Sequence, residues 1–288
     1  MEIKELPGNA AGFEIKSAQV GDTFSISVAV PDFTGLPDAV ARGLKKRFRV
    51  LYVTDGDGMF PVARRHATSG RVLDPDNHGE GIIVVGVGYG GDATQQFIKR
   101  ARDLTPPGIT MAEEAKHLYR GAKLGGADNF LRFLEKELHP VISEHFPVLK
   151  GRAGLSGFSY GGLFAAYAML RRSPLFDRYI IGSPADTAAE ILLQTEKACF
   201  AGSKVLDATA YLTCGELERR SALPGLRTIA RTYYKLIARL IERDYKGFSF
   251  GCREYAGQSH GTYAFACLDD GVDYLYPRIK TALEQPST

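Results

Sequence analysis

The feature that most constrains this chain is the motif GFSYG at residues 157–161, which Gly162 follows. An apolar stretch typical of a buried strand precedes the motif, and an alanine-rich stretch typical of a helix follows it. In such a tight strand-to-helix turn the serine takes a strained backbone conformation. Glycines two residues before and after it prevent a clash between strand and helix. The motif and its context predict a nucleophile elbow that exposes Ser159.

Strand and helix patterns along the chain predict an α/β fold. Strand patterns come first, and helix and strand patterns then alternate, which implies a mostly parallel central sheet with antiparallel N-terminal strands and helices on both faces. Because no repeat or linker is visible, we expect one domain, residues 1–288, with the α/β-hydrolase fold. The expected strands are 12–18, 22–30, 47–54, 81–88, 151–158, 178–182, 208–214 and 248–255, and the expected helices are 127–145, 161–172, 187–200, 226–244 and 263–283.

A serine nucleophile needs a base within hydrogen-bond distance, and α/β-hydrolases place serine, acid and histidine in that order along the chain. Of the six histidines, His260 alone follows Ser159. It lies in a polar loop between the last expected strand and the last expected helix, where the fold places the general base. His260 is therefore the expected base.

The acid is expected in the loop after the strand 208–214, which contains Glu216 and Glu218. Its role would be to fix the histidine tautomer and to stabilise the imidazolium. Position alone leaves both glutamates as candidates.

The oxyanion hole should combine two backbone N–H groups. One is expected from Tyr160, the residue after the nucleophile. The other is expected from the glycine-rich turn that follows the strand 47–54, at Gly56 or Asp57.

Composition excludes several other classes of protein. Hydrophobic residues make up 44% of the chain and the formal net charge is only +3, so we expect neither nucleic acid nor a membrane as partner. The N-terminus has no apolar stretch of signal-peptide length, so the expected location is the cytoplasm. The four cysteines form no C-x-x-C pair, and the aspartates at 55 and 57 have no further ligands at suitable spacing, so no metal or cofactor is expected.

One motif favours another class, a dinucleotide-binding oxidoreductase. Residues 86–91 match G-x-G-x-x-G after an apolar strand, but that fold needs a helix and then a second strand. Here DLTPP at 103–107 interrupts the pattern, and no strand pattern follows before residue 127. The match is therefore interpreted as incidental.

From about residue 47 onward the chain resembles the esterase-D-like branch of the α/β-hydrolases. That branch includes S-formylglutathione hydrolases, feruloyl esterases, mycolyltransferases and the esterases that open trilactone siderophores. The resemblance is carried by DGD at 55–57, by RARDLTP at 100–106, which is similar to a signature of siderophore-esterase-like members, by GGAD at 125–128 and by GELE at 215–218. In this family the second acidic position of the last motif usually serves, which implies Glu218 as the acid.

The resemblance also implies substrate contacts, and it has two departures. Arg100 and Arg102 are candidates for substrate binding, although an Arg–Asp pair that orders a loop is an equal alternative. Phe158, a third candidate for substrate binding, stands where family members often carry histidine. The segment SPAD at 183–186 replaces a family S-P-S segment followed by tryptophan, and the chain has no tryptophan. Both departures fall near the expected substrate cleft.

Together these patterns predict a serine carboxylic-ester hydrolase that forms an acyl-enzyme with a small-molecule ester or lactone of the siderophore-esterase type. The alternatives are an acyltransferase with the same triad, a hydrolase of thioesters or aryl esters like those of the related families, and a relative that binds ligand without turnover.

Overall fold

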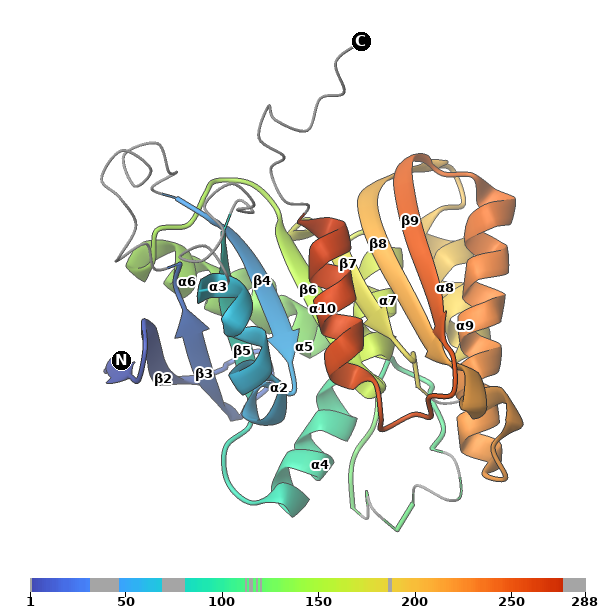
Figure 1. The fold of residues 1–288 in the computed structure, drawn as a ribbon, viewed down its shortest axis with the longest axis horizontal. Coiled ribbons are helices and arrows are strands. Elements are labelled where there is room, and N and C mark those ends of the chain that lie inside the picture. Colours follow the sequence, from blue (N-terminus) through green and yellow to red (C-terminus); the bar gives the residue numbers. More distant parts are fainter. Residues whose placement is uncertain are drawn as a thin grey trace.

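The computed structural model describes residues 2–31, 47–68, 81–111, 113, 116, 117, 119, 121–185 and 188–276. Within these residues, nine strands form one sheet in the order β1-β2-β3-β5-β4-β6-β7-β8-β9 (Figure 1). The strands are β1 Lys4–Leu6, β2 Ala10–Lys16, β3 Thr23–Ala29, β4 Arg49–Thr54, β5 Ile82–Gly88, β6 Ala153–Phe158, β7 Phe176–Gly182, β8 Val205–Gly215 and β9 Lys246–Tyr255.

The direction of strand pairing changes at β5. Strands β1, β2, β3 and β5 pair antiparallel, whereas β5, β4, β6, β7, β8 and β9 pair parallel. All seven residues of β5 are buried, as its continuous apolar run predicts for a strand covered on both faces. The predicted sheet, with antiparallel strands first and parallel strands after, is confirmed.

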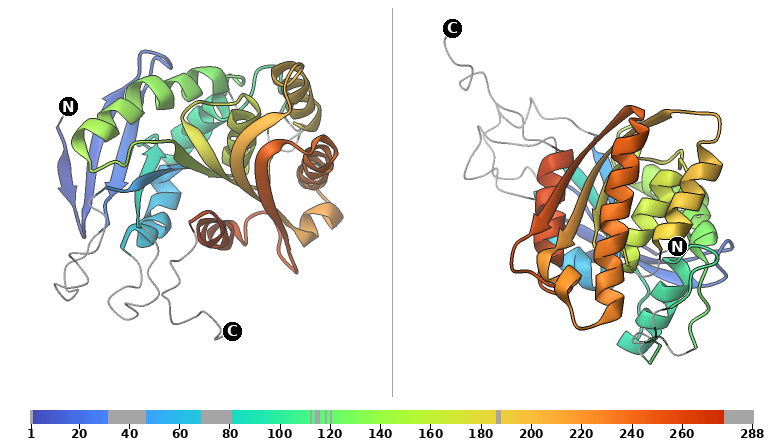
Figure 2. Two further views of the ribbon diagram at one scale, coloured as in Figure 1. Left: turned by 90° about the horizontal axis from the view of Figure 1, so that it is seen from above. Right: turned by 90° about the vertical axis from the view of Figure 1, so that its right-hand side faces the viewer.

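Helices cover both faces of this sheet (Figure 2). Alternate residues of β4 show the two layers: Leu51 and Val53 belong to a core with α2, α3 and α10, whereas Tyr52 belongs to a larger core with α5 to α9. The helices are α2 Gly56–Ala63, α3 Arg65–Thr68, α4 Ala93–Asp103, α5 Ala127–Phe133, the π-helical turn η2 Leu134–Leu138, α6 His139–His145, α7 Tyr160–Leu170, α8 Ala189–Cys199, the 3₁₀ turn η3 Glu216–Arg220, α9 Pro224–Arg243 and α10 Ala264–Leu275.

Five elements were not expected from the sequence: β1, α2, α3, α4 and the turn η3. Helix α4 is amphipathic, and Asp92 caps it by accepting the Gln95 N–H at 3.0 Å. Helix α2 contains two glycines and Pro61, which have low helix propensity, so its packing against β5 stabilises it instead. The last helix was expected to reach residue 283, but α10 ends at Leu275 and Tyr276 is no longer helical; residues 277–283 lie outside the described residues.

The parallel strands place their carboxyl ends along one edge of the sheet. Strands β4, β6, β7, β8 and β9 all end there, and α4 lies across the same edge (Figure 1). In open α/β sheets this edge binds ligands. The loops that follow these strands therefore carry the candidate site.

Candidate active site

Ser159 occupies the sharp turn between β6 and α7. Its backbone has φ 62° and ψ −121°, a conformation rare for any residue with a side chain. The flanking glycines are required by close packing, because a Cβ on Gly157 would lie 2.1 Å from the Gly161 oxygen and one on Gly161 would lie 2.2 Å from Thr54 Oγ1. The strained turn leaves the Ser159 hydroxyl at the start of a fully buried helix.

His260 reaches the nucleophile from the loop after β9. Its Nε2 atom lies 2.9 Å from Ser159 Oγ. The imidazole also lies beside Phe158, with 5.2 Å between ring centroids, and Phe158 in turn contacts the Tyr263 ring at 5.1 Å. Phe158 therefore forms one wall against the face of the histidine ring.

Glu218, in the turn η3 after β8, contacts the other ring nitrogen of His260. It completes a relay of hydrogen bonds that runs from Ser159 through His260 to Glu218. Its Oε1 atom lies 3.0 Å from His260 Nδ1, and its side chain is fully buried. Because a carboxylate can only accept hydrogen bonds, Nδ1 carries the imidazole proton, and the lone pair of Nε2 faces Ser159. This tautomer is the one a general base needs.

Glu216, the other candidate acid, faces away from His260. Its carboxylate accepts the Gly257 N–H at 3.0 Å and forms ion pairs with Arg219 and Arg220. The hydrogen bond from Gly257 lowers the pKa of Glu216. Of the two candidates left open by position along the chain, the structure brings only Glu218 to the histidine.

The expected oxyanion donors lie at two helix N-termini. Tyr160 is the first residue of α7, and Gly56 and Asp57 are the first two residues of α2, so the expected open turn at 55–58 is in fact the start of a helix. A Cβ on Gly56 would lie 2.6 Å from the Gly86 backbone. This close approach packs the start of α2 against β5. The two helices follow β4 and β6, which pair in parallel, so both helix starts lie at the same sheet edge, where N-terminal N–H groups favour developing negative charge.

The Asp57 carboxylate is bound by backbone N–H groups. It accepts the N–H groups of Tyr89 at 2.6 Å and Gly90 at 3.1 Å, which ties α2 to the end of β5. A Cβ on Gly88 would lie 2.6 Å from this carboxylate. Gly86, whose Cβ would meet the Phe60 side chain, and Gly88 thus make room for α2, which accounts for the first two glycines of the G-x-G-x-x-G match.

Arg100 links the two halves of the expected oxyanion hole. Its guanidinium holds both oxygens of Asp55, with Nε–Oδ1 at 2.6 Å and Nη2–Oδ2 at 3.0 Å, and donates to the Tyr119 hydroxyl at 3.0 Å. It also lies over the Tyr160 ring, 5.4 Å from the centroid. Asp55 has φ 55° and directly precedes Gly56, so the ion pair fixes the backbone from which α2 starts.

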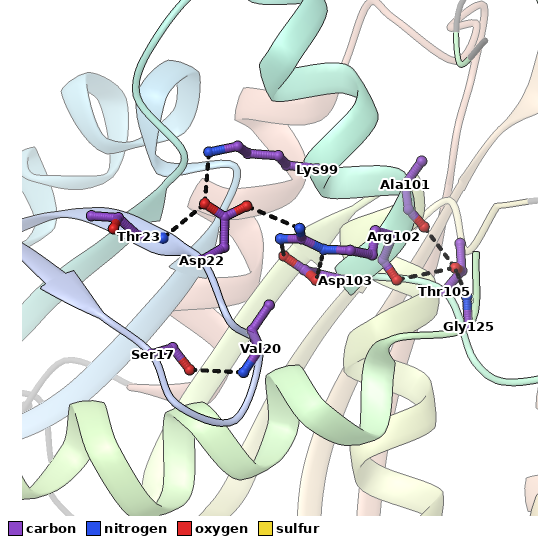
Figure 3. Close-up of polar contacts among 10 residues, drawn as sticks. All are labelled: Ser17, Val20, Asp22, Thr23, Lys99, Ala101, Arg102, Asp103, Thr105 and Gly125. Carbon is purple, nitrogen blue, oxygen red and sulfur yellow. Dashed lines mark hydrogen bonds and ion pairs between the residues drawn. The ribbon is translucent and has the colours of Figure 1, made fainter. Parts of the chain in front are cut away.

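Arg102 lies in a second ion-pair network, shown in Figure 3. Its guanidinium binds both oxygens of the buried Asp103 at 2.7 and 2.8 Å and one oxygen of Asp22 at 2.9 Å. Lys99 holds the other Asp22 oxygen at 3.0 Å. All three nitrogens of each guanidinium are engaged within the protein, which favours loop ordering over substrate binding for both arginines.

Two side chains that contact the acid were not expected from the sequence. Ser183 Oγ donates to Glu218 Oε1 at 2.6 Å, and Cys214 Sγ donates to Glu218 Oε2 at 3.2 Å. Cys214 is the second-last residue of β8, and Ser183 directly follows β7, which lies between the strands that lead to the nucleophile and to the acid. Ser183 could have been identified from the strand order, because the residue after β7 lies between the ends of β6 and β8.

Neither a candidate metal site nor a membrane-spanning helix is found among the described residues. No group of three or more histidine, cysteine, aspartate or glutamate side chains within them could hold a metal ion. No helix in the same part of the chain has the length and apolar character needed to cross a bilayer.

Comparisons with known proteins place this chain in a family. The family model described as putative esterase matches residues 34–217, more than half of the chain. The siderophore enterobactin esterase of Emericella nidulans is 30% identical over 290 residues, covering 93% of each protein. The siderophore triacetylfusarinine C esterase of Aspergillus fumigatus is 32% identical over 157 residues, which cover 54% of this chain and half of that protein.

A solved structure gives the same assignment. The siderophore hydrolase of Aspergillus nidulans superposes with a TM-score of 0.73 at 26% identity, covering 96% of this chain and 98% of that one. The expected α/β-hydrolase fold and ester-hydrolase class are thus confirmed. The chain belongs to the putative esterase family, and within that family of ester hydrolases it is similar to the siderophore esterases.

Proposed function

We propose that this protein hydrolyses a carboxylic ester through an acyl-enzyme on Ser159. The observation that carries the proposal is the relay from Ser159 through His260 to Glu218, with both contacts at 3.0 Å or less. His260 Nε2 takes the Ser159 proton as Oγ attacks the ester carbonyl, and it then gives that proton to the departing alkoxide. A water molecule, deprotonated by the same nitrogen, releases the acid and restores the serine.

Glu218 holds the imidazole and stabilises its charged form. Its carboxylate is fully buried, so its attraction for the imidazolium is screened less than at the surface. The negative oxygen of the tetrahedral intermediate would be stabilised by the N–H of Tyr160 and by one from Gly56 or Asp57. These N–H groups are fixed by the helix starts before any substrate arrives.

The proposed substrate is a siderophore ester or lactone. This proposal depends on the relatives, which are named as esterases of enterobactin and of triacetylfusarinine C. Phe158 lies against the catalytic histidine ring and is a candidate surface for an apolar part of such a substrate. Arg100 is held by the Asp55 carboxylate and Arg102 by the carboxylates of Asp103 and Asp22. We therefore propose that both arginines shape the site and do not bind the substrate.

The test is product analysis with intact siderophores. The protein is incubated with a catecholate trilactone and with a hydroxamate triester, and mass spectrometry follows the ring-opened and monomeric acids. We expect hydrolysis of at least one by the parent and a loss on the order of 10⁶-fold in kcat in Ser159→Ala. Equal turnover by the two proteins would contradict the mechanism.

A parallel reaction with added alcohol separates hydrolysis from acyl transfer. Hydrolysis yields only the free acid, whereas an acyltransferase yields a new ester at the expense of the acid. Dominant formation of the new ester would replace the hydrolase proposal with the transferase alternative.

A further inference from the structure

Ser183 lies between the nucleophile and the acid. It directly follows β7, which pairs with the nucleophile strand β6 on one side and the acid strand β8 on the other. Its backbone has φ 40°, a rare value for a residue other than glycine, and its side chain is fully buried. A strained, buried, polar residue at this position requires a reason beyond packing.

The hydrogen bonds of Ser183 have a defined direction. An ionised carboxylate can only accept, so Ser183 donates its single hydroxyl proton to Glu218 Oε1, 2.6 Å away. The Ser183 oxygen also contacts the Tyr263 hydroxyl, and because the serine proton is already used, Tyr263 is the donor in that contact. The chain of donors runs from Tyr263 to Ser183 to Glu218, and His260 donates to the same carboxylate oxygen.

The donor at the start of this chain keeps its proton. Burial, followed by the charge of Glu218, raises the pKa of Tyr263 well above its ordinary value. Tyr263 is almost fully buried and its ring packs against Tyr255, with 4.6 Å between centroids. Tyr263 therefore donates to Ser183, and Ser183 to Glu218, throughout the working pH range of a serine esterase.

The same segment also holds the backbone of the nucleophile. The Gly182 carbonyl accepts the Ser159 N–H at 2.9 Å, and the Ala185 N–H donates to the Ser159 carbonyl at 3.1 Å. The segment 182–185 thus contacts the nucleophile through its backbone and the acid through a side chain. These contacts fix the positions of Ser159 and Glu218 relative to each other, and His260 bridges the two side chains.

We propose that Ser183, supported by Tyr263, is a positioning residue that orients the Glu218 carboxylate toward His260, an inference that rests on the function proposed above. The Ser183 hydroxyl is buried and contacts Glu218 and Tyr263, so it acts on the reaction through Glu218. Its loss should lower kcat and leave KM nearly unchanged. The expected size is roughly 10- to 100-fold in kcat, the effect of one hydrogen bond to a charged group.

The test uses Ser183→Gly in the full chain. Glycine adopts the positive φ of this position without strain, so the variant removes the hydroxyl and preserves the turn. Tyr263→Phe, which leaves the Ser183 donor in place, should lower kcat in the same direction by less. The decisive comparison repeats Ser183→Gly in a Glu218→Gln background, where a residue that acts through Glu218 should have an effect below about twofold.

The outcomes separate this inference from the proposed function. Unchanged kcat in Ser183→Gly, or an equal loss in both backgrounds, would overturn the positioning role while the parent still turns over ester. If the parent shows no Ser159-dependent turnover at all, the proposed function fails and the inference fails with it. A kcat loss confined to the background with Glu218 supports both.

Discussion

Two sets of carboxylates at the same edge of the sheet are held in opposite ways. Glu218 accepts from the neutral groups of Ser183 and Cys214, and among the described residues His260 is its only ion-pair partner. Asp55 and Asp103, by contrast, each receive two hydrogen bonds from an arginine.

The difference follows from what each carboxylate has to do. An arginine compensates a carboxylate permanently, which suits Asp55 and Asp103 because they only order backbone. Glu218 has to stabilise a positive charge that appears on His260 during the reaction. The neutral donors fix the position of the Glu218 carboxylate without neutralising its charge, so that charge can stabilise the imidazolium.

Among substitutions of these carboxylates and their partners, the largest expected effect separates the two glutamates of η3. Glu218→Gln should lower kcat about 10²- to 10³-fold, because an amide cannot compensate the imidazolium and can present the wrong tautomer. The corresponding change in a serine protease costs about 10⁴-fold. Glu216→Gln is the matched control and should leave kcat nearly unchanged.

Steady-state kinetics of the two glutamine variants decide between them. Equal small losses would indicate a Ser–His dyad without an essential acid. A larger loss in Glu216→Gln would reverse the assignment.

The next effect tests the arginine side of the comparison. Arg100→Lys keeps the charge but cannot hold both Asp55 oxygens, so α2 and its N–H groups should shift. Removing an oxyanion donor outright costs about 10²- to 10³-fold, so we expect a smaller loss of roughly tenfold, mainly in kcat. Arg102→Lys, two residues along the same helix, is the matched control.

Kinetics of the two lysine variants on one ester provide the measurement. Arg102→Lys is expected to keep the parent kcat and KM. A large rise in KM in either variant would instead support direct substrate binding by that arginine.

The smallest effect concerns stability at Asp22. Burial alone would raise the pKa of Asp22, but hydrogen bonds from Lys99, Arg102 and the Thr23 N–H outweigh it, so the pKa lies below its ordinary value of 3.8. A lowered pKa stabilises the fold above the unfolded-state pKa, and this stabilisation is lost as the pH falls through the folded-state pKa. Asp22→Asn should therefore lower the free energy of unfolding by about 0.5 to 1 kcal/mol near neutral pH.

Urea unfolding of the parent and Asp22→Asn provides the measurement. The difference between them should shrink in acid, because the parent then loses the same charge. A difference that stays constant from neutral pH to below the pKa of Asp22 would show that the charge contributes nothing.

The local patterns of the chain predicted the parallel half of the fold and the relay better than the rest of the site. The elbow and the single histidine after it needed only chain order, and the strands around them have strong apolar patterns. Helix α2 could not be predicted from residues 56–63, because packing against β5 stabilises it in spite of its glycines and Pro61. The contact of Ser183 with Glu218 depends on strand order in the sheet, which local patterns do not contain.

The sequence predicted that an arginine of the segment 100–106 could pair with an aspartate, but it did not predict which aspartate each arginine binds. An Arg–Asp pair that orders a loop was one of two interpretations of RARDLTP at 100–106. The structure pairs Arg102 with its neighbour Asp103, but it pairs Arg100 with Asp55, 45 residues away. Pairs between distant residues are set by how α4 lies across the sheet edge, so the sequence pattern alone could not assign them.

Covalent labelling tests most directly whether Ser159 is a nucleophile activated by His260. The parent, Ser159→Ala and His260→Ala are each treated with a fluorophosphonate, digested, and examined by mass spectrometry. The relay predicts one adduct per parent chain, on the peptide that contains Ser159, none on Ser159→Ala, and much slower labelling of His260→Ala. An adduct on another residue, or labelling of Ser159→Ala at the parent rate, would contradict it.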